Sequence, residues 1–405
     1  MRRQKELDFL LTIFLVLNAI RNICFFFSML EIARLVFYVA HIVLAFIIVI
    51  IVMLKISKPI KVTGHLIAAI ILISMLVIVP MSYGLSIWAI NSFTPISFLF
   101  TMLFIVVSKD IRISDHTIKV CCITYIVQAI VAIFCSFMPS SFEYGALVLH
   151  IGNPNQTAII LWAAFVFSYL YWEKKLVKKN TFLLWVIMIC LAIMIILTQS
   201  RSISLSLIIV LVWHFLGNRK ARFKNFPLLI QYALIFAPLY IPVIILLLMN
   251  ILPSGITIFG KLLFSGREQI WQKIADAFLQ NPFSYHLDVS PFYSNVMFNN
   301  VVSLKGWGAH NGFFAIQWSY GILVSMSVVY ILYCNLIELK KNAENNVNSC
   351  IVYIVTLATI FSLSFEEALL MGNIFTTAIL PLLFLIGRSE HYNSLSNVVE
   401  LKGKR

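Results

Sequence analysis

Three residues that lie far apart in the sequence, Arg201, Arg267 and His310, have side chains suited to chemistry on a phosphate ester. A guanidinium group binds phosphate oxygens through two parallel hydrogen bonds and stays charged at any relevant pH. An imidazole is the usual side chain for taking a proton near neutral pH. If the three converge at one site, the arginines can hold a lipid pyrophosphate while the histidine deprotonates a hydroxyl that displaces it.

These residues also have simpler interpretations. Arg201 and Arg267 can extend to lipid headgroups, as long basic side chains do at a membrane surface. His310 and the following Asn311 can form the cap of a helix at the membrane interface. The residue types alone do not separate these interpretations from the chemical one, so the elements that position them matter.

Glu366, Glu367 and Asn311 are secondary candidates. One of the two glutamates can assist in acceptor binding or act as a base, although a solvated turn or a carboxylate facing other helices is the more common role. No metal or cofactor is predicted, because the histidines are too scattered in the sequence for a metal-binding spacing. The sequence also contains no phosphate-binding Gly-rich loop and no nucleophile elbow.

The composition predicts that membrane helices position these residues. The chain has 405 residues, 61% of them hydrophobic and 11% charged, whereas a soluble domain carries roughly 25% charged residues. Uncharged runs such as Ile42–Leu54 are typical of spanning helices, because a backbone in lipid must satisfy its own hydrogen bonds. We predict an all-α, polytopic integral membrane protein of about twelve transmembrane helices, with residues 1–405 as a single membrane domain. The predicted spans are 8–28, 33–54, 63–80, 87–107, 118–138, 155–172, 181–197, 202–217, 228–249, 311–335, 350–365 and 371–387.

The net charge of +14 is explained by topology rather than by a nucleic-acid partner. With a cytoplasmic N-terminus, most of the 30 Lys and Arg residues fall on the cytoplasmic side, as the positive-inside rule requires. An even number of spans then places both chain ends in the cytoplasm. The basic start of the sequence has no evident cleavage site, which favours a retained first span over a removed signal peptide.

One long stretch, residues 250–310, interrupts the short loops and is predicted to be extracytoplasmic. It contains none of the seven cysteines, so no disulfide is expected there. Ser265–Glu268 has the spacing of a capping box, and Asn281-Pro282 is a stop signal. The apolar residues between them lie on one helical face and are Ile270, Trp271, Ile274, Ala277 and Phe278. We predict an amphipathic helix that lies on the outer membrane surface or packs over the helix bundle.

The predicted spans 181–197 and 202–217 are short. At about 1.5 Å per residue, each reaches roughly 25 Å, which is less than the roughly 30 Å of hydrocarbon in a bilayer. The connection between them, Thr198–Arg201, is therefore expected below the outer surface. Polar backbone at that depth is tolerated only where protein or water surrounds it, so Arg201 is expected to face a cavity.

Five short segments carry a resemblance to a known family. They are Gly152-Asn-Pro-Asn-Gln156, Thr198-Gln-Ser-Arg201, Ser265-Gly-Arg-Glu-Gln-Ile-Trp271, His310-Asn311 and Trp318-Ser-Tyr-Gly-Ile322. In this order, and with this long loop, they resemble the O-antigen ligase and polysaccharide polymerase superfamily of bacterial membrane glycosyltransferases. The resemblance covers residues 152–322 and departs from the family pattern at 281–285, where members often have a pair of glycines.

The resemblance implies a metal-independent, inverting transfer of a glycan from a polyprenyl pyrophosphate to an acceptor hydroxyl, with no cofactor. It implies that Arg201 and Arg267 bind and stabilise the pyrophosphate. It also implies that His310 acts as the base or orients the acceptor. Because pyrophosphate is already a good leaving group, charge stabilisation can replace a general acid.

We therefore predict a polymerase of lipid-linked oligosaccharide repeat units, acting at the outer face of the bacterial cytoplasmic membrane to make capsule, exopolysaccharide or O-antigen. A ligase that moves finished polysaccharide to another acceptor is an alternative that uses the same residues. A flippase or exporter of lipid-linked sugars is an alternative from another class. The expected partners are the polyprenyl-pyrophosphate-linked oligosaccharide, the lipid bilayer, and other polysaccharide-assembly proteins such as a flippase and a chain-length regulator.

Overall fold

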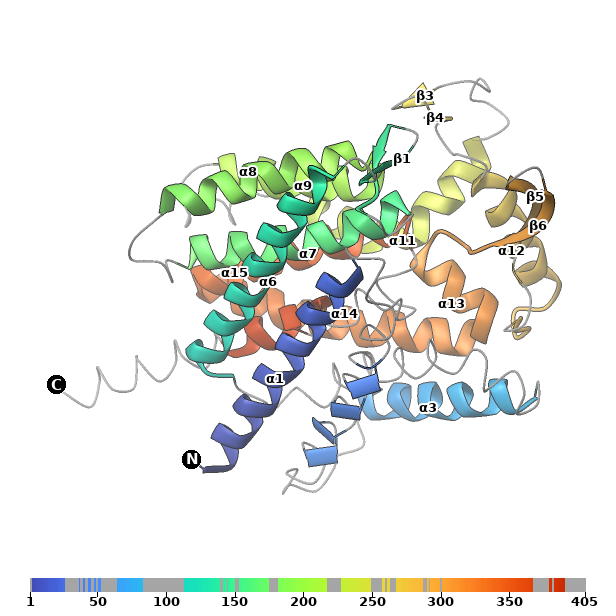
Figure 1. Ribbon diagram of the computed structural model, residues 1–405. Coiled ribbons are helices and arrows are strands. Elements are labelled where there is room, and N and C mark those ends of the chain that lie inside the picture. The colour runs from blue at the N-terminus through green and yellow to red at the C-terminus, as the bar shows by residue number, and fades with distance from the viewer. Residues whose placement is uncertain are drawn as a thin grey trace.

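The computed structural model describes the chain in segments (Figure 1). The described residues are 2–25, 36, 39–40, 43–44, 47–48, 50–51, 64–82, 113–138, 141–143, 145–149, 153–174, 181–216, 227–248, 257–258, 261–262, 267–286, 290, 292–298, 301–366, 379–380 and 382–389. Of the predicted spans, 87–107 lies wholly outside these residues, and about half or more of 33–54 and of 371–387 lies outside them. Spans 8–28, 63–80, 202–217 and 228–249 extend beyond them by one to three residues.

The described residues form mostly α-helices, as predicted. The helices are α1 (Arg2–Phe25), α3 (Gly64–Ser82), α6 (Asp115–Ser136), α7 (Pro154–Glu173), α8 (Thr181–Leu197), α9 (Arg201–Phe215), α11 (Leu228–Leu248), α12 (Arg267–Gln280), α13 (Gly312–Tyr320), α14 (Ile322–Asn345) and α15 (Val347–Ser362). Three antiparallel hairpins, which the sequence analysis did not predict, pair β1 (Phe142–Glu143) with β2 (Ala146–Leu147), β3 (Thr257–Ile258) with β4 (Lys261–Leu262), and β5 (Phe292–Phe298) with β6 (Val301–Trp307).

Helices α7 and α15 form the centre of the fold. Every residue from 157 to 170 in α7, and from 349 to 360 in α15, is buried. An apolar helix without a polar stripe is expected to be covered on all sides, and α15 indeed packs against α7, α9, α11 and α14. The Trp162 Nε1 group donates a hydrogen bond of 3.1 Å to Thr359 Oγ1 and links the two central helices. Side chains at the ends of these helices are therefore held by a closely packed core.

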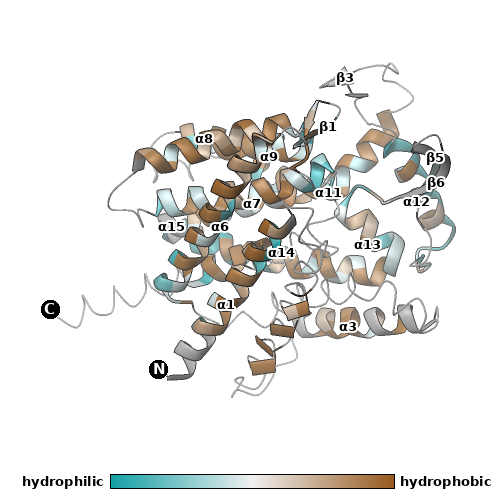
Figure 2. Ribbon diagram, viewed as in Figure 1, coloured by the Kyte–Doolittle hydropathy of each residue, from teal (hydrophilic) through white to brown (hydrophobic). Residues whose placement is uncertain are grey.

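The surrounding helices carry exposed apolar side chains. Helices α1, α6 and α8 pack on the α7 side of the core, while α3 and α14 pack together on another side (Figure 1). Hydrophobic residues cover most of these helices, whereas α12 carries hydrophilic ones (Figure 2). On α8, the side chains of Phe182, Ile189 and Ile193 are more than half exposed. Such contiguous apolar surface is typical of a membrane-facing helix.

Three of the described helices are long and apolar enough to cross a membrane by length and composition. They are Asp115–Ser136, Leu228–Leu248 and Ile322–Glu344. Shorter apolar helices cover Phe182–Leu197, Arg201–Phe215 and Ser349–Ser362. The prediction of about twelve spans is therefore not supported, and it is corrected to three candidate spans among the described residues.

Helix length accounts for part of the difference. Helices α8, α9 and α15 have 17, 15 and 16 residues, fewer than the roughly 20 that a straight crossing needs, as the sequence already indicated for the first two. The predicted span 311–335 contains two helices, α13 and α14, divided at Gly321, so the candidate span begins at Ile322 and not at residue 311. Gly321 has φ +79° and ψ 178°, a conformation that essentially only glycine adopts.

The break at Gly321 lies against residues 281–285, the segment at which the sequence departs from the family pattern. A Cβ atom on Gly321 would lie 3.2 Å from the carbonyl oxygen of Ser284 and 3.3 Å from that of Phe283. The backbone of residues 281–285 thus packs directly against this glycine. The Gln317 side chain adds a hydrogen bond of 3.4 Å to the carbonyl oxygen of Pro282. The departing segment is therefore a structural support of the α13–α14 break.

The predicted amphipathic helix in the long loop is confirmed as α12. It ends at Gln280, directly before Asn281-Pro282, and buries Ile270, Trp271 and Ile274 as expected. Phe278, also assigned to the buried face, is 37% exposed. The helix contacts α11 and α13, so it packs over the bundle. Ser265, the predicted capping residue, lies outside the described residues.

Candidate functional site

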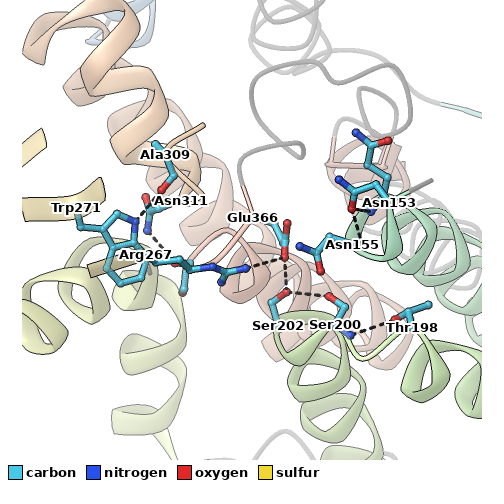
Figure 3. A network of polar contacts seen from close by, with 12 residues as sticks. Asn153, Asn155, Thr198, Ser200, Ser202, Arg267, Trp271, Ala309, Asn311 and Glu366 are labelled. Atoms are coloured by element: carbon cyan, nitrogen blue, oxygen red, sulfur yellow. Dashed lines mark hydrogen bonds and ion pairs between the residues drawn. The ribbon is translucent and has the colours of Figure 1, made fainter. Parts of the chain in front are cut away.

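The site is built around Glu366, which follows the C-terminal end of α15. The Ser202 hydroxyl donates a hydrogen bond of 3.1 Å to Glu366 Oε1. The guanidinium Nη2 of Arg267 lies 3.8 Å from the same oxygen (Figure 3). Glu366 is only 5% exposed. A buried carboxylate is retained where cations and hydrogen-bond donors offset its desolvation, and here those groups come from α9 and α12.

Arg201 is the first residue of α9 and belongs to the same charge cluster. Its charge interacts with those of Arg267 and Glu366. The preceding residue, Ser200, occupies the N-cap position without a side-chain cap hydrogen bond. Ser200 and Ser202 also contact one another at 3.4 Å between their hydroxyl oxygens. The start of α9 thus presents a guanidinium group and hydroxyls to the site.

The turn before Arg201 is buried, as its position between two short helices predicted. Thr198 and Ser200 are buried, and the Ser200 backbone N–H donates to Thr198 Oγ1 at 3.2 Å. Gln199 has φ +56°, a left-handed conformation that is uncommon for a residue other than glycine. Its side-chain amide donates a hydrogen bond of 3.1 Å to the carbonyl oxygen of Gly145, in the β1–β2 turn. This contact fixes the direction in which the chain enters α9.

Arg267 is held in place by the helix that it begins. Its guanidinium carbon lies 5.6 Å from the ring centroid of Phe365, close enough for a cation–π contact. One turn further along α12, Trp271 is fully buried and donates a hydrogen bond of 2.7 Å from Nε1 to the carbonyl oxygen of Ala309. Trp271 therefore attaches α12 to the residue before His310.

His310 lies between the long loop and α13, close to Arg267. Burial, with a smaller contribution from the positive charge of Arg267, lowers the pKa of His310 to about 4. The imidazole is therefore neutral near pH 7 and has a nitrogen able to accept a proton. Its backbone has φ +51°. Like Gln199, His310 holds an uncommon conformation directly beside the site, and such conformations persist only where the surrounding contacts enforce them.

Asn311 provides the contacts that enforce this conformation. Its side-chain oxygen accepts hydrogen bonds of 2.9 Å from the backbone N–H groups of Phe313 and Phe314 and so caps α13. Its Nδ2 group donates to the carbonyl oxygens of Pro238, at 2.8 Å, and Ser364, at 3.1 Å. Asn311 is fully buried. The helix-cap interpretation of this residue is confirmed.

The bond from Asn311 to Pro238 follows from the sequence of α11. In an α-helix, the carbonyl of residue 238 would accept from the N–H of residue 242, but residue 242 is a proline and has no N–H. The freed carbonyl needs another donor in an apolar surrounding. Asn311 supplies it, and this bond ties the start of α13 to α11. The second bond of the same Nδ2 group, to Ser364, ties the start of α13 to the end of α15.

The N-terminal ends of several helices therefore meet at the end of α15. The starts of α9 and α12 bring Ser202 and Arg267 to Glu366, and the start of α13 bonds to residues 363 and 364. Each helix N-terminus carries roughly half a positive charge from its aligned peptide dipoles. Together with two arginines, these ends create a strongly positive field that a phosphate group matches well.

The start of α7 completes the site on another side. The Asn153 side-chain oxygen caps this helix by accepting from the backbone N–H groups of Asn155, at 2.9 Å, and Gln156, at 3.4 Å. Figure 3 shows the Asn155 side chain directed from α7 toward Glu366 and Ser200. The sequence analysis assigned no role to this segment, although it was part of the family resemblance.

Four of the predicted site residues thus come together: Arg201, Arg267, His310 and Glu366. Glu367 lies outside the described residues. Ser202 and Asn155 were missed, because a serine and an asparagine at helix starts are common and carry no distinctive spacing. Within the described ranges, no three His, Cys, Asp or Glu side chains are grouped as metal ligands would be.

No protein-family model matches the chain, and no curated protein matches it either. The resemblance drawn from short segments is therefore not supported by an overall similarity in sequence. The functional argument rests on the geometry of the site.

Replacement of Asn311 tests the link between α11, α13 and α15. Asn311→Ala removes the cap and both donors, which is expected to lower the free energy of unfolding by roughly 2–4 kcal/mol. Asn311→Ser keeps a capping oxygen and should lose less. The measurement is thermal unfolding in detergent, with Asn281→Ala as a control that removes one exposed side-chain hydrogen bond, which the Asn281 oxygen accepts from the backbone N–H of Phe283. Equal stability of the alanine variants at 281 and 311 would contradict the assigned role.

The pair of Arg267 and Glu366 is tested by a double-mutant cycle. Arg267→Gln should destabilise the protein, because the buried carboxylate loses one of its cations. Adding Glu366→Gln should restore part of the loss, with a coupling energy of roughly 0.5–3 kcal/mol. The cycle is measured by the same unfolding assay. Strictly additive effects would show that the two side chains do not interact.

Proposed function

We propose that this protein is a membrane glycosyltransferase that polymerises polyprenyl-pyrophosphate-linked repeat units at the outer face of the bacterial cytoplasmic membrane. The observation that carries the proposal is the convergence of Arg201, Arg267, His310 and Glu366 from separate segments. Two fixed cations, a neutral imidazole and a carboxylate are the groups that such a transfer needs. The apolar helices beside the site suit a lipid-linked substrate.

The proposed reaction is an in-line displacement at the anomeric carbon of the donor sugar. The acceptor hydroxyl oxygen forms a bond to that carbon, while the bond from the carbon to the pyrophosphate oxygen breaks, and the configuration inverts. Arg201, Arg267 and the helix N-termini stabilise the negative charge that develops on the leaving pyrophosphate. The proton of the hydroxyl passes to the unprotonated ring nitrogen of His310.

Glu366 orients the cationic side of the site in this proposal. It contacts Arg267 from α12 and Ser202 from the start of α9, the helix that Arg201 begins. A bound pyrophosphate competes with Glu366 for Arg267 and releases the carboxylate toward the acceptor. This exchange of partners is supported by the long distance of 3.8 Å between Arg267 Nη2 and Glu366 Oε1. A contact of this length leaves the guanidinium group able to turn toward a pyrophosphate, with which it can form shorter, paired hydrogen bonds.

Purified protein in detergent, given lipid-linked repeat units without a gradient or potential, tests the proposed function. The wild type should lengthen the glycan, and EDTA should leave the rate unchanged. Arg201→Lys should lower the rate by about 10²-fold, because an ammonium group cannot form two parallel hydrogen bonds with a phosphate. His310→Ala should lower it by about 10²–10⁴-fold.

The control for these variants is Lys273→Ala, which removes a cation from the exposed side of α12 and should keep the wild-type rate. Absence of any lengthening by the wild type, together with transport of the same lipid into vesicles, would replace the transferase by a carrier. Attachment of long chains to a second acceptor, without lengthening, would make the protein a ligase.

The pH dependence of the reaction tests the state of His310. With a pKa of about 4, the imidazole is already neutral at pH 5.5, so kcat/KM should change by less than about twofold between pH 7.5 and 5.5. A histidine with an ordinary pKa near 6.5 would instead lose about tenfold over this range. Because kcat/KM reports the free enzyme, the measurement needs subsaturating donor. A midpoint near pH 6.5 that disappears in the His310→Ala variant would contradict the burial of this side chain.

A further inference from the structure

The start of α7 differs from the rest of that helix in its exposure. Residues 157–170 are all buried, whereas Asn153 is exposed and Asn155 and Gln156 are partly exposed. These three positions are polar amides at the accessible end of an otherwise apolar helix. The Asn153 side chain serves as the cap, which explains its presence. The capping bonds use only the backbone N–H groups of the other two, so their side chains are not needed for the helix.

The side chains at the start of α7 differ in charge from those on the opposite side of Glu366. Figure 3 shows Arg267 on one side of the Glu366 carboxylate and Asn155 on the other. The α7 side offers side-chain amides, and Gln199 adds another amide from the neighbouring turn, bonded to Gly145. An amide both donates and accepts hydrogen bonds and carries no charge. It therefore suits sugar hydroxyls, whereas the arginines suit the pyrophosphate.

We propose that Asn155 and Gln156, at the start of α7, form the binding subsite for the acceptor glycan and present its hydroxyl to the reacting centre. This inference rests on the proposed function. An inverting displacement requires the acceptor and the leaving group on opposite faces of the reacting sugar. The cationic side of Glu366 takes the leaving pyrophosphate. The amide side therefore receives the sugar rings of the acceptor, and the reacting hydroxyl extends from there toward His310.

The test uses an acceptor that cannot act as a donor, namely an alkyl glycoside of the repeat unit without pyrophosphate. Transfer from the lipid-linked donor to this probe is measured at saturating donor while the probe concentration varies. Asn155→Ala should raise the KM for the probe by about tenfold, because its hydroxyls lose an amide partner. The KM for the lipid-linked donor, measured at saturating probe, should stay within about twofold of wild type.

Gln272→Ala is the matched control, since it removes an amide from the exposed side of α12, where Gln272 bonds only to Asp276. It should change neither KM. If Asn155→Ala does not survive purification, Asn155→Ser carries the same expectation. An unchanged KM for the probe, or an equal rise in the KM for the donor, would overturn the acceptor subsite while wild-type transfer upholds the proposed function. Failure of the wild type to transfer to either acceptor would overturn both.

Discussion

The arrangement of the site follows from an electrostatic constraint at the end of α15. Two guanidinium groups and the N-terminal ends of α9, α12 and α13 are gathered in a largely buried place, where like charges repel strongly. Glu366 offsets this positive charge by contacting Ser202 and Arg267. The uncommon backbone conformations of Gln199 and His310 lie directly beside it. In the proposed reaction, a bound anion replaces this carboxylate as the partner of Arg267.

This constraint explains why the supporting contacts are so specific. Helices α7 and α15 are covered on all sides, so their ends cannot shift without disturbing the core. Trp271 fixes α12 to Ala309, and Asn311 fixes α13 to both α11 and the end of α15. Pro242 makes the bond between Asn311 and α11 possible, because it leaves the carbonyl oxygen of Pro238 without its helical N–H donor. The cations are therefore held by contacts that exist independently of any substrate.

The sequence predicted those features of the structure that short stretches of residues determine. The face of α12 that buries Trp271, its end before Asn281, and the buried turn before Arg201 followed from periodicity, stop signals and helix length. The division of the predicted span 311–335 into α13 and α14 did not, since hydropathy cannot reveal that Gly321 breaks the apolar run. Glu366 was identified as a candidate, but its pairing with Arg267 joins residues 99 positions apart, and no local pattern encodes such a contact.

The charges of the site also bear on when a proton acceptor becomes available in the proposed reaction. Without donor, Arg267 pairs with Glu366 and its charge disfavours a proton on His310. A bound pyrophosphate neutralises the arginines, and its own negative charge favours protonation of any nearby group. The capacity of His310 to take the hydroxyl proton thus rises only once the leaving group is in place. Because the imidazole is a weak base before that point, the basicity of the site is coupled to the presence of the donor.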